Sequence, residues 1–505
     1  MKSKTKVIDV GLVKKFIIRE KILLAILFVA SILRFLNYSN RWALAYDQAW
    51  FAVIARHALE TLQLPLLGPF ASGGPFQTGG EWFWIVMVGV LINPFSVISP
   101  WIFITLLSIL QVYLLFFLGK QFISRNFGYV VAILGAVSTS QTLQATNLTN
   151  QMTASIFATL FLIFFLQHIK TRKKIYLLLL GLSVGLSSSI HLQGILLLPA
   201  LLIAVIFAKI IKPREILLIG FGLLLPWIPV LISDSNNNFY NTLNMFNYAF
   251  MSQGQVSYEM LGRRWLTFVG IFIPSSWGRI IGGFPVFGYA EIVLVALISV
   301  KLLLAKSIKR EWWIILLSLV AMIICLRYIR TPIYENYITF LHPFIFLITG
   351  LMIWEFFKIK RLIGILVLSG IVFSSIIATM IDIRGSSNVT AIKAAQYRDI
   401  LKSKFPGSKF ALYDYKYKSG HRSLPLVYFL QTERLLDNNG QKIGAVQAAL
   451  GEQILFVGHK ALFGKLGDFQ LYDLSASSSS VLEKHGWSPV NPSFIYNSVQ
   501  YWYKK

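Results

Sequence analysis

Charged residues and cysteine are both scarce in this chain. Of its 505 residues, 13% are charged and 56% are hydrophobic, whereas about a quarter of the residues in an average soluble domain are charged. This composition predicts a polytopic membrane protein. The single cysteine, Cys325, lies in an apolar run, which excludes an intramolecular disulfide and a cysteine metal cluster.

Acidic residues are fewer still, and the familiar motifs of nucleotide and hydrolase chemistry are missing. The chain has 47 Lys and Arg against 21 Asp and Glu, a formal net charge of +26. It has no Gly-rich phosphate loop, Walker motif, nucleophile elbow or zinc-binding helix. Its cations stand in short clusters between apolar runs, as the positive-inside rule requires, so the positive charge does not indicate a nucleic-acid partner.

Eleven apolar runs have lengths suited to membrane spans of roughly 20 residues. A further run, Trp82–Ile98, is ambiguous, and the charges decide it. With the basic N-terminal cluster Lys2–Lys21 in the cytoplasm, a spanning 82–98 would put Lys120, Arg125 and the Lys170–Lys174 cluster on the wrong face. The eleven runs lie at 21–36, 101–118, 127–143, 152–169, 175–190, 194–208, 215–232, 284–300, 312–328, 336–354 and 362–380.

We therefore expect Trp82–Ile98 to be re-entrant or interfacial. The expected fold is an all-α polytopic protein of the plasma membrane with about 11 transmembrane helices, a cytoplasmic N-terminus and an external C-terminus. The inner loops carry mostly cations, whereas polar residues concentrate in the outer segments, so any chemistry is expected on the outer face. The outer segments are 37–81, 142–151, the turn at His191, 233–283 and 330–336.

The sequence changes in character at Arg384. A helix is expected over Lys393–Lys404, and short strands are expected at 410–415, 454–457 and 469–474. The pattern predicts two domains: a transmembrane domain, 1–383, and a soluble extracytoplasmic α/β domain, 384–505, of a size typical of an independent unit.

The segment 37–81 holds the most informative polar pattern. Tyr46-Asp47-Gln48 precedes a helix expected over 49–63, apolar on one side and polar on the other, which is typical of a helix lying along a membrane surface. Asp47 is either the cap of this helix or a catalytic carboxylate. The other acidic candidates outside the membrane are Glu60, Glu81, Asp234, Glu259, Glu291 and Glu335.

Five short motifs follow one another along the chain: Leu33-Arg34-Phe35, Tyr46-Asp47-Gln48-Ala49-Trp50, Gly79-Gly80-Glu81-Trp82, Glu335-Asn336-Tyr337 and His342-Pro343. Taken in order, these motifs resemble the GT-C glycosyltransferases, and within them the protein O-mannosyltransferase and aminoarabinose-transferase superfamily. The resemblance covers residues 20–380 and implies transfer of a sugar from a polyprenyl-phosphate carrier to a protein, lipid or glycan on the exoplasmic face. The family's first-loop acid matches Asp47.

The chain departs from the family pattern in two places. Gln48 stands where the family usually has Glu, and the next external loop offers Asn147, Asn150 and Gln151 in place of a second acid. Both departures favour a single base, Asp47, over a two-carboxylate or metal-dependent scheme. No cofactor is certain, and a divalent cation fits the resemblance but is not favoured. One base with direct displacement predicts inversion at the sugar.

The phosphate leaving group requires cations or hydrogen-bond donors rather than an acid, and arginine, histidine and tyrosine side chains can supply them. Several candidates have a structural alternative: Arg34 would snorkel to the headgroups, Glu335 would pair with Arg330, and Asp234 would belong to an ordinary loop. Competing functions are a transporter or flippase of lipid-linked glycans, a glycan ligase or polymerase, and a non-catalytic relative; the scarcity of charges within the spans favours the enzyme. The candidates for binding substrate and phosphate are Arg34, Arg41, Glu81, His191, Asp234, Arg330, Glu335 and Tyr337.

Overall fold

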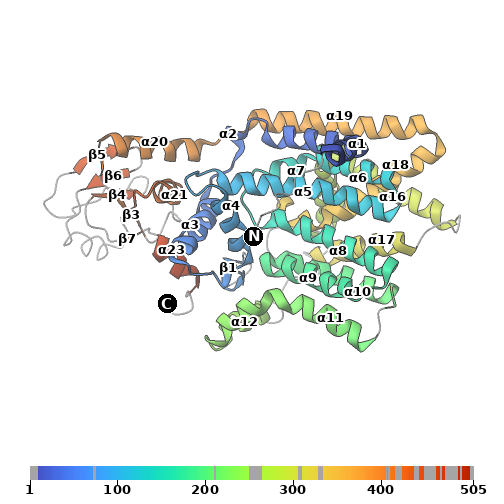
Figure 1. The fold of residues 1–505 in the computed structure, drawn as a ribbon, viewed down its shortest axis with the longest axis horizontal. Helices are drawn as coiled ribbons and strands as arrows, with labels where there is room; N and C mark the ends of the chain where they lie inside the picture. The colour runs from blue at the N-terminus through green and yellow to red at the C-terminus, as the bar shows by residue number, and fades with distance from the viewer. Residues whose placement is uncertain are drawn as a thin grey trace, which may run out of the picture.

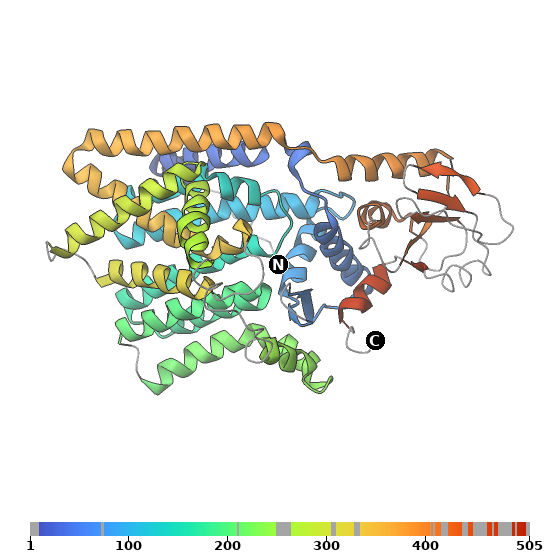
Figure 2. The same cartoon turned by 180° about the vertical axis from the view of Figure 1, so that it is seen from behind.

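The apolar runs form a bundle of long helices, most of which follow one common direction (Figures 1 and 2). Each of the eleven predicted runs lies wholly or mostly in one of them. They are α1 (Val10–Phe35), α5 (Ser99–Phe122), α6 (Arg125–Val137), α8 (Gln151–Thr171), α9 (Ile175–Ile190), α10 (Leu197–Phe207), α11 (Pro213–Leu224), α16 (Pro285–Leu304), α17 (Arg310–Arg327), α18 (His342–Ile359) and α19 (Arg361–Gly385). The computed structural model describes residues 10–71, 75–209, 212–248, 264–304, 310–327, 334–404, 406–407, 410–415, 423–436, 443–447, 462–466, 469–472, 487–489 and 492–500.

Six helical segments of the described residues are long and apolar enough to cross a membrane. Shorter apolar helices accompany them, among them Arg125–Val137 and Ile175–Ile190. The chain is therefore a multi-pass membrane protein, while the number of eleven crossings stays a prediction. The six segments are Ser99–Phe122, Gln151–Thr171, Pro213–Ser235, Pro285–Leu304, Glu335–Ile359 and Arg361–Ser403.

Basic residues from several loops gather at one end of the bundle, which we call the basic end. Arg125 at the start of α6 pairs with Glu20 of α1, Nη2 to Oε2 at 2.9 Å, and Lys170 at the end of α8 donates to the carbonyl of Gln121. The helix α1 runs from this end to the opposite end, and α5 runs back to it. The apolar helix α4 (Glu81–Ile92), which comes between them in the chain, therefore adds no net crossing. Its 12 residues span about 18 Å, less than the hydrocarbon core of roughly 30 Å.

The opposite end of the bundle, which we call the polar end, is built from short elements (Figure 1). The strands β1 and β2 form an antiparallel hairpin in which Leu67 lies opposite Gly79 and Phe70 opposite Gln77. The elements are α2 (Tyr38–Arg41), α3 (Tyr46–Thr61), β1 (Leu67–Phe70), β2 (Gln77–Gly79), α7 (Thr139–Gln144), η1 (Leu192–Leu196), η2 (Leu225–Trp227), α12 (Ile228–Ser235), α13 (Tyr240–Phe246), η4 (Phe268–Phe272), α15 (Ile273–Ile280) and η5 (Glu335–Leu341).

The described C-terminal elements lie beyond the polar end and comprise three helices and a five-stranded sheet (Figure 1). The sheet order is β5-β6-β4-β3-β7, with β3 and β4 parallel and the other pairs antiparallel. The strand expected at 454–457 lies outside the described residues, and the division into two domains stays a prediction. The elements are α20 (Val389–Lys404), β3 (Phe410–Tyr415), α21 (Leu424–Thr432), β4 (Ile443–Gln447), β5 (Leu462–Leu466), β6 (Phe469–Tyr472), β7 (Trp487–Pro489) and α23 (Pro492–Gln500).

The expectation that the helix after Asp47 lies along a membrane surface is wrong, because both sides of α3 are covered by protein. On one side Phe51 packs against Trp82 of α4, with ring centroids 5.8 Å apart. On the other side the guanidinium of Arg56 lies 5.7 Å from the ring centre of Tyr428 in α21, and α23 also packs on α3. One apolar core joins these elements, so the polar face read from the sequence is a protein interface.

Candidate functional site

Asp47 lies in the first turn of α3, at the polar end. The cap position belongs to Ala45, whose backbone N–H donates to Gln48 Oε1 at 3.2 Å, so Asp47 is not the helix cap. Its carboxylate is exposed, and no other described residue donates a hydrogen bond to it or forms an ion pair with it. Partial desolvation raises the pKa of Asp47 above its ordinary value of 3.8, which makes its carboxylate a stronger base.

The two departures from the family pattern meet in space. Gln48 Nε2 donates to Asn147 Oδ1 at 2.7 Å, although the two residues are 99 positions apart. The backbone supports the same contact, because Ala43 N donates to the carbonyl of Thr146 at 3.1 Å. The side chains of Gln48 and Asn147 therefore form a neutral amide pair beside Asp47, and neither position supplies a second carboxylate.

The stretch 138–151, called here the neutral segment, connects most of the polar end. It includes α7 and the loop that leads to α8. Its backbone carbonyls accept hydrogen bonds from three other elements, and its Asn150 side chain donates to the end of α9. The carbonyl contacts are Arg41 Nη2 to Thr142 O at 2.6 Å, Thr105 Oγ1 to Ala145 O at 2.8 Å and Thr339 Oγ1 to Gln151 O at 2.5 Å.

Two of the predicted phosphate-binding cations are occupied by backbone carbonyls. Arg34 is fully buried and donates to Ser108 Oγ at 2.8 Å and to the carbonyl of Ala136 at 3.0 Å, which joins α1 to α5 and α6. Arg41 donates to the carbonyls of Leu33 and Leu36 at 2.9 and 3.1 Å, at the end of α1. The last carbonyls of a helix lack partners within it, so Arg41 caps α1.

Glu81 lies at the start of α4, where it accepts a hydrogen bond from Ser189 Oγ at 2.8 Å. Its side chain is buried, and burial raises the pKa of its carboxyl. A Cβ on Gly79 would overlap both Glu81 Oε2 and Ser189 Oγ, so a larger residue there would displace the two side chains that form this hydrogen bond. The structure thus explains the Gly-Gly-Glu motif as the junction of the first loop with α9.

His191 and Tyr337, two predicted site residues, lie side by side. Their ring centroids are 5.6 Å apart, and Tyr334 packs on Tyr337 from another direction at 5.4 Å. His191 ends α9, while the two tyrosines belong to η5 and the residue before it. Burial lowers the pKa of His191 to about 4, so its imidazole is neutral at pH 7.

Asp234 holds the second long loop in place. Its two carboxylate oxygens accept from the backbone N–H groups of Asn241 and Thr242, both at 2.8 Å, which stabilises the start of α13. Asn241 in turn pairs with the backbone of Gln77, accepting from its N–H at 2.7 Å and donating to its carbonyl at 3.1 Å. These contacts connect residues 234–242, at the start of the second long loop, to the β1–β2 hairpin.

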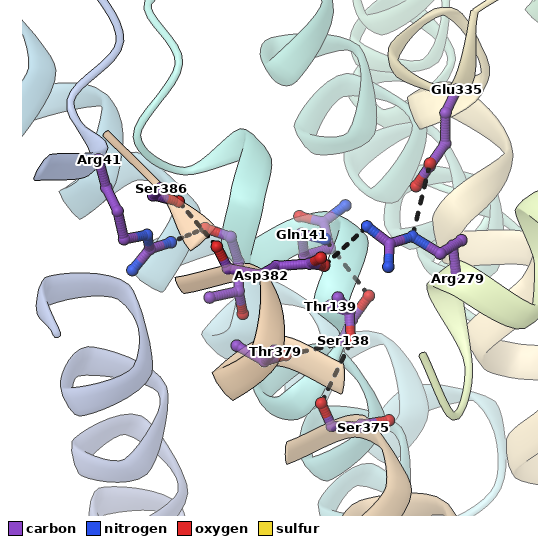
Figure 3. A network of polar contacts seen from close by, with 11 residues as sticks. Arg41, Ser138, Thr139, Gln141, Arg279, Glu335, Ser375, Thr379, Asp382 and Ser386 are labelled. Carbon is purple, nitrogen blue, oxygen red and sulfur yellow. Dashed lines mark hydrogen bonds and ion pairs between the residues drawn. The ribbon is translucent and has the colours of Figure 1, made fainter. Parts of the chain in front are cut away.

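Glu335 forms its described ion pair with a residue far away in sequence, Arg279 of α15 (Figure 3). Arg279 Nε lies 3.8 Å from Glu335 Oε2, and Arg279 Nη2 donates to Asp382 Oδ2 of α19 at 2.8 Å. Gln141 of the neutral segment, labelled near Asp382 in Figure 3, belongs to α7, which packs on both α15 and α19. Arg330, the partner expected for Glu335, lies outside the described residues.

The sequence did not identify Arg279 and Asp382 as site residues. Arg279 lies in an outer segment, against the positive-inside trend, and Asp382 directly follows the last apolar run, so both had a charge signal. Their pairing had none, because 103 positions separate them. Among the described residues no group of three or more His, Cys, Asp or Glu side chains is arranged to hold a metal ion.

The chain resembles known proteins both in sequence and in fold. A family model described as dolichyl-phosphate-mannose-protein mannosyltransferase matches residues 82–232, less than a third of the chain. The crystal structure of ArnT from Cupriavidus metallidurans bound to undecaprenyl phosphate shares 12% identity and a TM-score of 0.62, covering 91% of this chain and 99% of that one. Its apo form gives 12% identity and a TM-score of 0.59, covering 90% and 98%.

The chain has the ArnT fold. The predicted resemblance to the GT-C glycosyltransferases of the mannosyltransferase and aminoarabinose-transferase superfamily is thereby confirmed. A GT-C fold is also shared with the Archaeoglobus fulgidus oligosaccharyltransferase tethered to an acceptor peptide, at 10% identity and a TM-score of 0.51, covering 85% of this chain and 69% of that one. Among curated proteins, no sequence match was found.

Proposed function

We propose that this protein is a membrane glycosyltransferase that moves a sugar from a polyprenyl-phosphate donor to an acceptor on the exoplasmic face, with Asp47 as general base. One observation carries the proposal. Of the carboxylates described at the polar end of this GT-C fold, Asp47 is the one that is exposed and has no partner, whereas Glu81, Asp234, Glu335 and Asp382 are each engaged.

The reaction needs one base and no acid. Asp47 takes the proton from an acceptor hydroxyl while that oxygen forms a bond to the anomeric carbon, and the bond from this carbon to the phosphate oxygen breaks. The polyprenyl phosphate leaves as a stabilised anion. Because Gln48 and Asn147 replace further acids, no second carboxylate is placed at these positions for a covalent intermediate, so we propose inversion at the sugar.

The groups proposed to bind the phosphate are His191, Tyr337 and Arg330. The guanidinium groups of Arg34 and Arg41 are occupied by carbonyls, which leaves them structural roles. His191 and Tyr337, side by side, supply neutral hydrogen-bond donors, and Arg330 is proposed as their cation. Donors of this kind stabilise the charge that develops on the leaving phosphate.

The same proposal fixes the orientation in the plasma membrane. The basic end, which includes Lys170 and Arg125, faces the cytoplasm. Asp47 and the C-terminal elements from Val389 onward then face the outside, and the eleven long helices cross the membrane. In this arrangement a soluble domain, 384–505, covers the first loop through α21 and α23, which pack on α3.

The test replaces Asp47 with Asn and measures transfer of labelled sugar from polyprenyl phosphate in membranes that lack the endogenous protein. Loss of transfer by a factor of about 10² to 10⁴ is expected. Glu60→Gln is the matched control, because Glu60 is an exposed acid on the same helix that accepts a hydrogen bond from Gln431. Transfer by Asp47→Asn within a few-fold of the control would refute the role of Asp47.

A further inference from the structure

The helix α23, near the C-terminus, packs on both α3 and strand β1 (Figures 1 and 2). The Tyr496 ring lies 5.4 Å from the ring of His57 on α3, and Tyr496 Oη donates to the carbonyl of Gln63 at 3.1 Å. At the end of α23, the carbonyl of Val499 accepts from Gln77 Nε2 of β2 at 2.9 Å. One short helix thus holds both the helix of the proposed base and the hairpin that follows it in the chain.

The side chain of Gln500, the last residue of α23, takes the place of a third strand beside β1. Gln500 Oε1 accepts from the backbone N–H groups of Leu66 and Leu67 at 3.0 and 2.9 Å, and Gln500 Nε2 donates to the carbonyl of Leu67 at 2.7 Å. The outer edge of a strand in a two-stranded hairpin lacks a pairing strand, and Leu67 is buried, so its backbone groups need another partner. A primary amide supplies both an acceptor and a donor, and Gln500 therefore satisfies these groups together.

The far end of β1 reaches the face of α3 that carries Asp47. Phe70, three residues after Leu67, lies with its ring parallel to that of Trp50, at an interplanar angle of 9° and a centroid distance of 6.4 Å. Trp50 follows Asp47 by three positions on α3, and residues three apart are neighbours on one face of a helix. Phe70 is exposed and Trp50 is half-buried. The position of the hairpin therefore decides where Phe70 lies relative to this face.

We infer that Gln500 is a positioning residue of the proposed active site, which sets the β1–β2 hairpin against α3 on the side where the acceptor binds. The inference rests on the proposed function. Because Asp47 takes the proton of the acceptor hydroxyl, the acceptor lies against the face of α3 that Asp47 and Trp50 share. Gln500 acts on this face through the backbone of Leu67 and the ring of Phe70, and does not touch a substrate itself.

Loss of the Gln500 contacts should affect the two substrates differently. The proposed phosphate ligands His191 and Tyr337 lie in other elements, at the end of α9 and in η5. Affinity for the polyprenyl phosphate should therefore stay the same, whereas the acceptor meets a displaced hairpin. A purely structural role of Gln500 would lower the unfolding temperature without raising the apparent KM for the acceptor.

The first variant is Gln500→Ala in the purified full-length protein. The protein is given labelled polyprenyl-phosphate sugar at saturation, and a detergent extract of host membranes that lack the endogenous protein is titrated as the source of acceptor. The apparent KM for this extract should rise at least about fivefold, while affinity for undecaprenyl phosphate stays within about twofold. Asn241 still holds β2 in this variant, so the hairpin is displaced rather than unfolded.

The matched control is Gln431→Ala. Gln431 is also a buried glutamine of the C-terminal elements, but its Nε2 donates to Glu60 Oε2 of α3 at 3.2 Å and not to the hairpin. Its replacement removes a comparable hydrogen bond and should leave the apparent KM for the extract unchanged. A rise in this KM equal to that of Gln500→Ala would assign both glutamines a structural role and overturn the inference.

A second, milder variant, Tyr496→Phe, covers the case in which Gln500→Ala does not fold. It removes the hydroxyl that donates to the carbonyl of Gln63 and keeps the ring beside His57, and it should raise the apparent KM roughly 2- to 5-fold. An unchanged KM in each variant that folds, in a reaction that Asp47→Asn abolishes, would overturn the inference and leave the proposed function intact. An equal loss of undecaprenyl phosphate affinity would also overturn the inference. Transfer that survives Asp47→Asn would overturn both.

Discussion

The two ends of the helical bundle use charge in different ways. At the basic end the exposed cations stand in short loops, as Lys173 and Lys174 do. At the polar end Arg34 and Arg41 bind carbonyls and Arg279 binds two carboxylates, while Arg384 in the last turn of α19 is exposed. In the proposed orientation the exposed cations of the basic end orient the chain in the membrane, whereas Arg34, Arg41 and Arg279 join helices at the polar end. Asp47, exposed and without a partner among the described residues, is the proposed reactive group.

The largest expected effect concerns the sides of the membrane on which the two ends lie. Leu62, which follows α3, is 90% exposed, and Lys173 lies in the loop after α8. In a Cys325→Ala background, Leu62→Cys should react with a membrane-impermeant thiol reagent added to intact cells, and Lys173→Cys should react only after permeabilisation. If both positions react from the same side, the proposed topology is wrong.

The next largest effect is a difference in stability between replacing Arg41 at the polar end and replacing Lys173 at the basic end. Replacing Arg41 with Met leaves the terminal carbonyls of α1 and that of Thr142 without their donor, so the free energy of unfolding should fall by about 2–4 kcal/mol. Thermal unfolding of the purified protein in detergent measures it. The control Lys173→Met removes an exposed cation at the other end and should change stability by less than about 0.5 kcal/mol. Equal effects of the two changes would remove the distinction between the ends.

A smaller effect is expected from the ion pairs that hold α15. The side chains of Arg279 and Asp382 are 27% and 28% exposed, so solvent screens their attraction. A double-mutant cycle of Arg279→Gln and Asp382→Asn should give a coupling free energy of about 0.5–1 kcal/mol in thermal unfolding. A coupling indistinguishable from zero would mean that the pair does not fasten α15 to α19.

The smallest effect tests the neutral surroundings of Asp47. Asn147→Asp places a second carboxylate near it, and a like charge disfavours ionisation, so the already raised pKa of Asp47 should rise further. The base is active when ionised, so the acidic limb of the pH–kcat/KM profile should move to higher pH. Asn236→Asp, an exposed position on the second loop, should leave the profile unchanged. A shift to lower pH in Asn147→Asp would contradict the account.

Much of this organisation was predictable, because it follows from local patterns. Each apolar run has its own signal in the sequence, and so does the strand at 410–415. The structure has helices at the apolar runs and the strand β3 at 410–415. The basic clusters likewise have a local signal in the sequence. The resemblance to the GT-C superfamily was predictable for the same reason. These properties need no knowledge of which distant residues meet.

Contacts between distant segments could not be predicted. The polar face of α3 gave the pattern of a helix at a water boundary, yet Tyr428, from far along the chain, covers Arg56. The pairing of Gln48 with Asn147 and of Arg279 with Asp382 is likewise set by packing and not by spacing. The chemical type of each candidate site residue can be read from the sequence. Its partners, which decide between a structural and a reactive role, are visible only in the fold.

Asp47 is proposed to be the base of the transfer reaction and to have no structural role. Binding and turnover can be measured separately in the purified full-length Asp47→Asn protein. Affinity for the polyprenyl-phosphate sugar and the unfolding temperature should stay close to those of the unaltered protein, while single-turnover transfer should fall by about 10² to 10⁴. Single-turnover transfer at an undiminished rate, or loss of donor binding together with lower stability, would contradict this proposal.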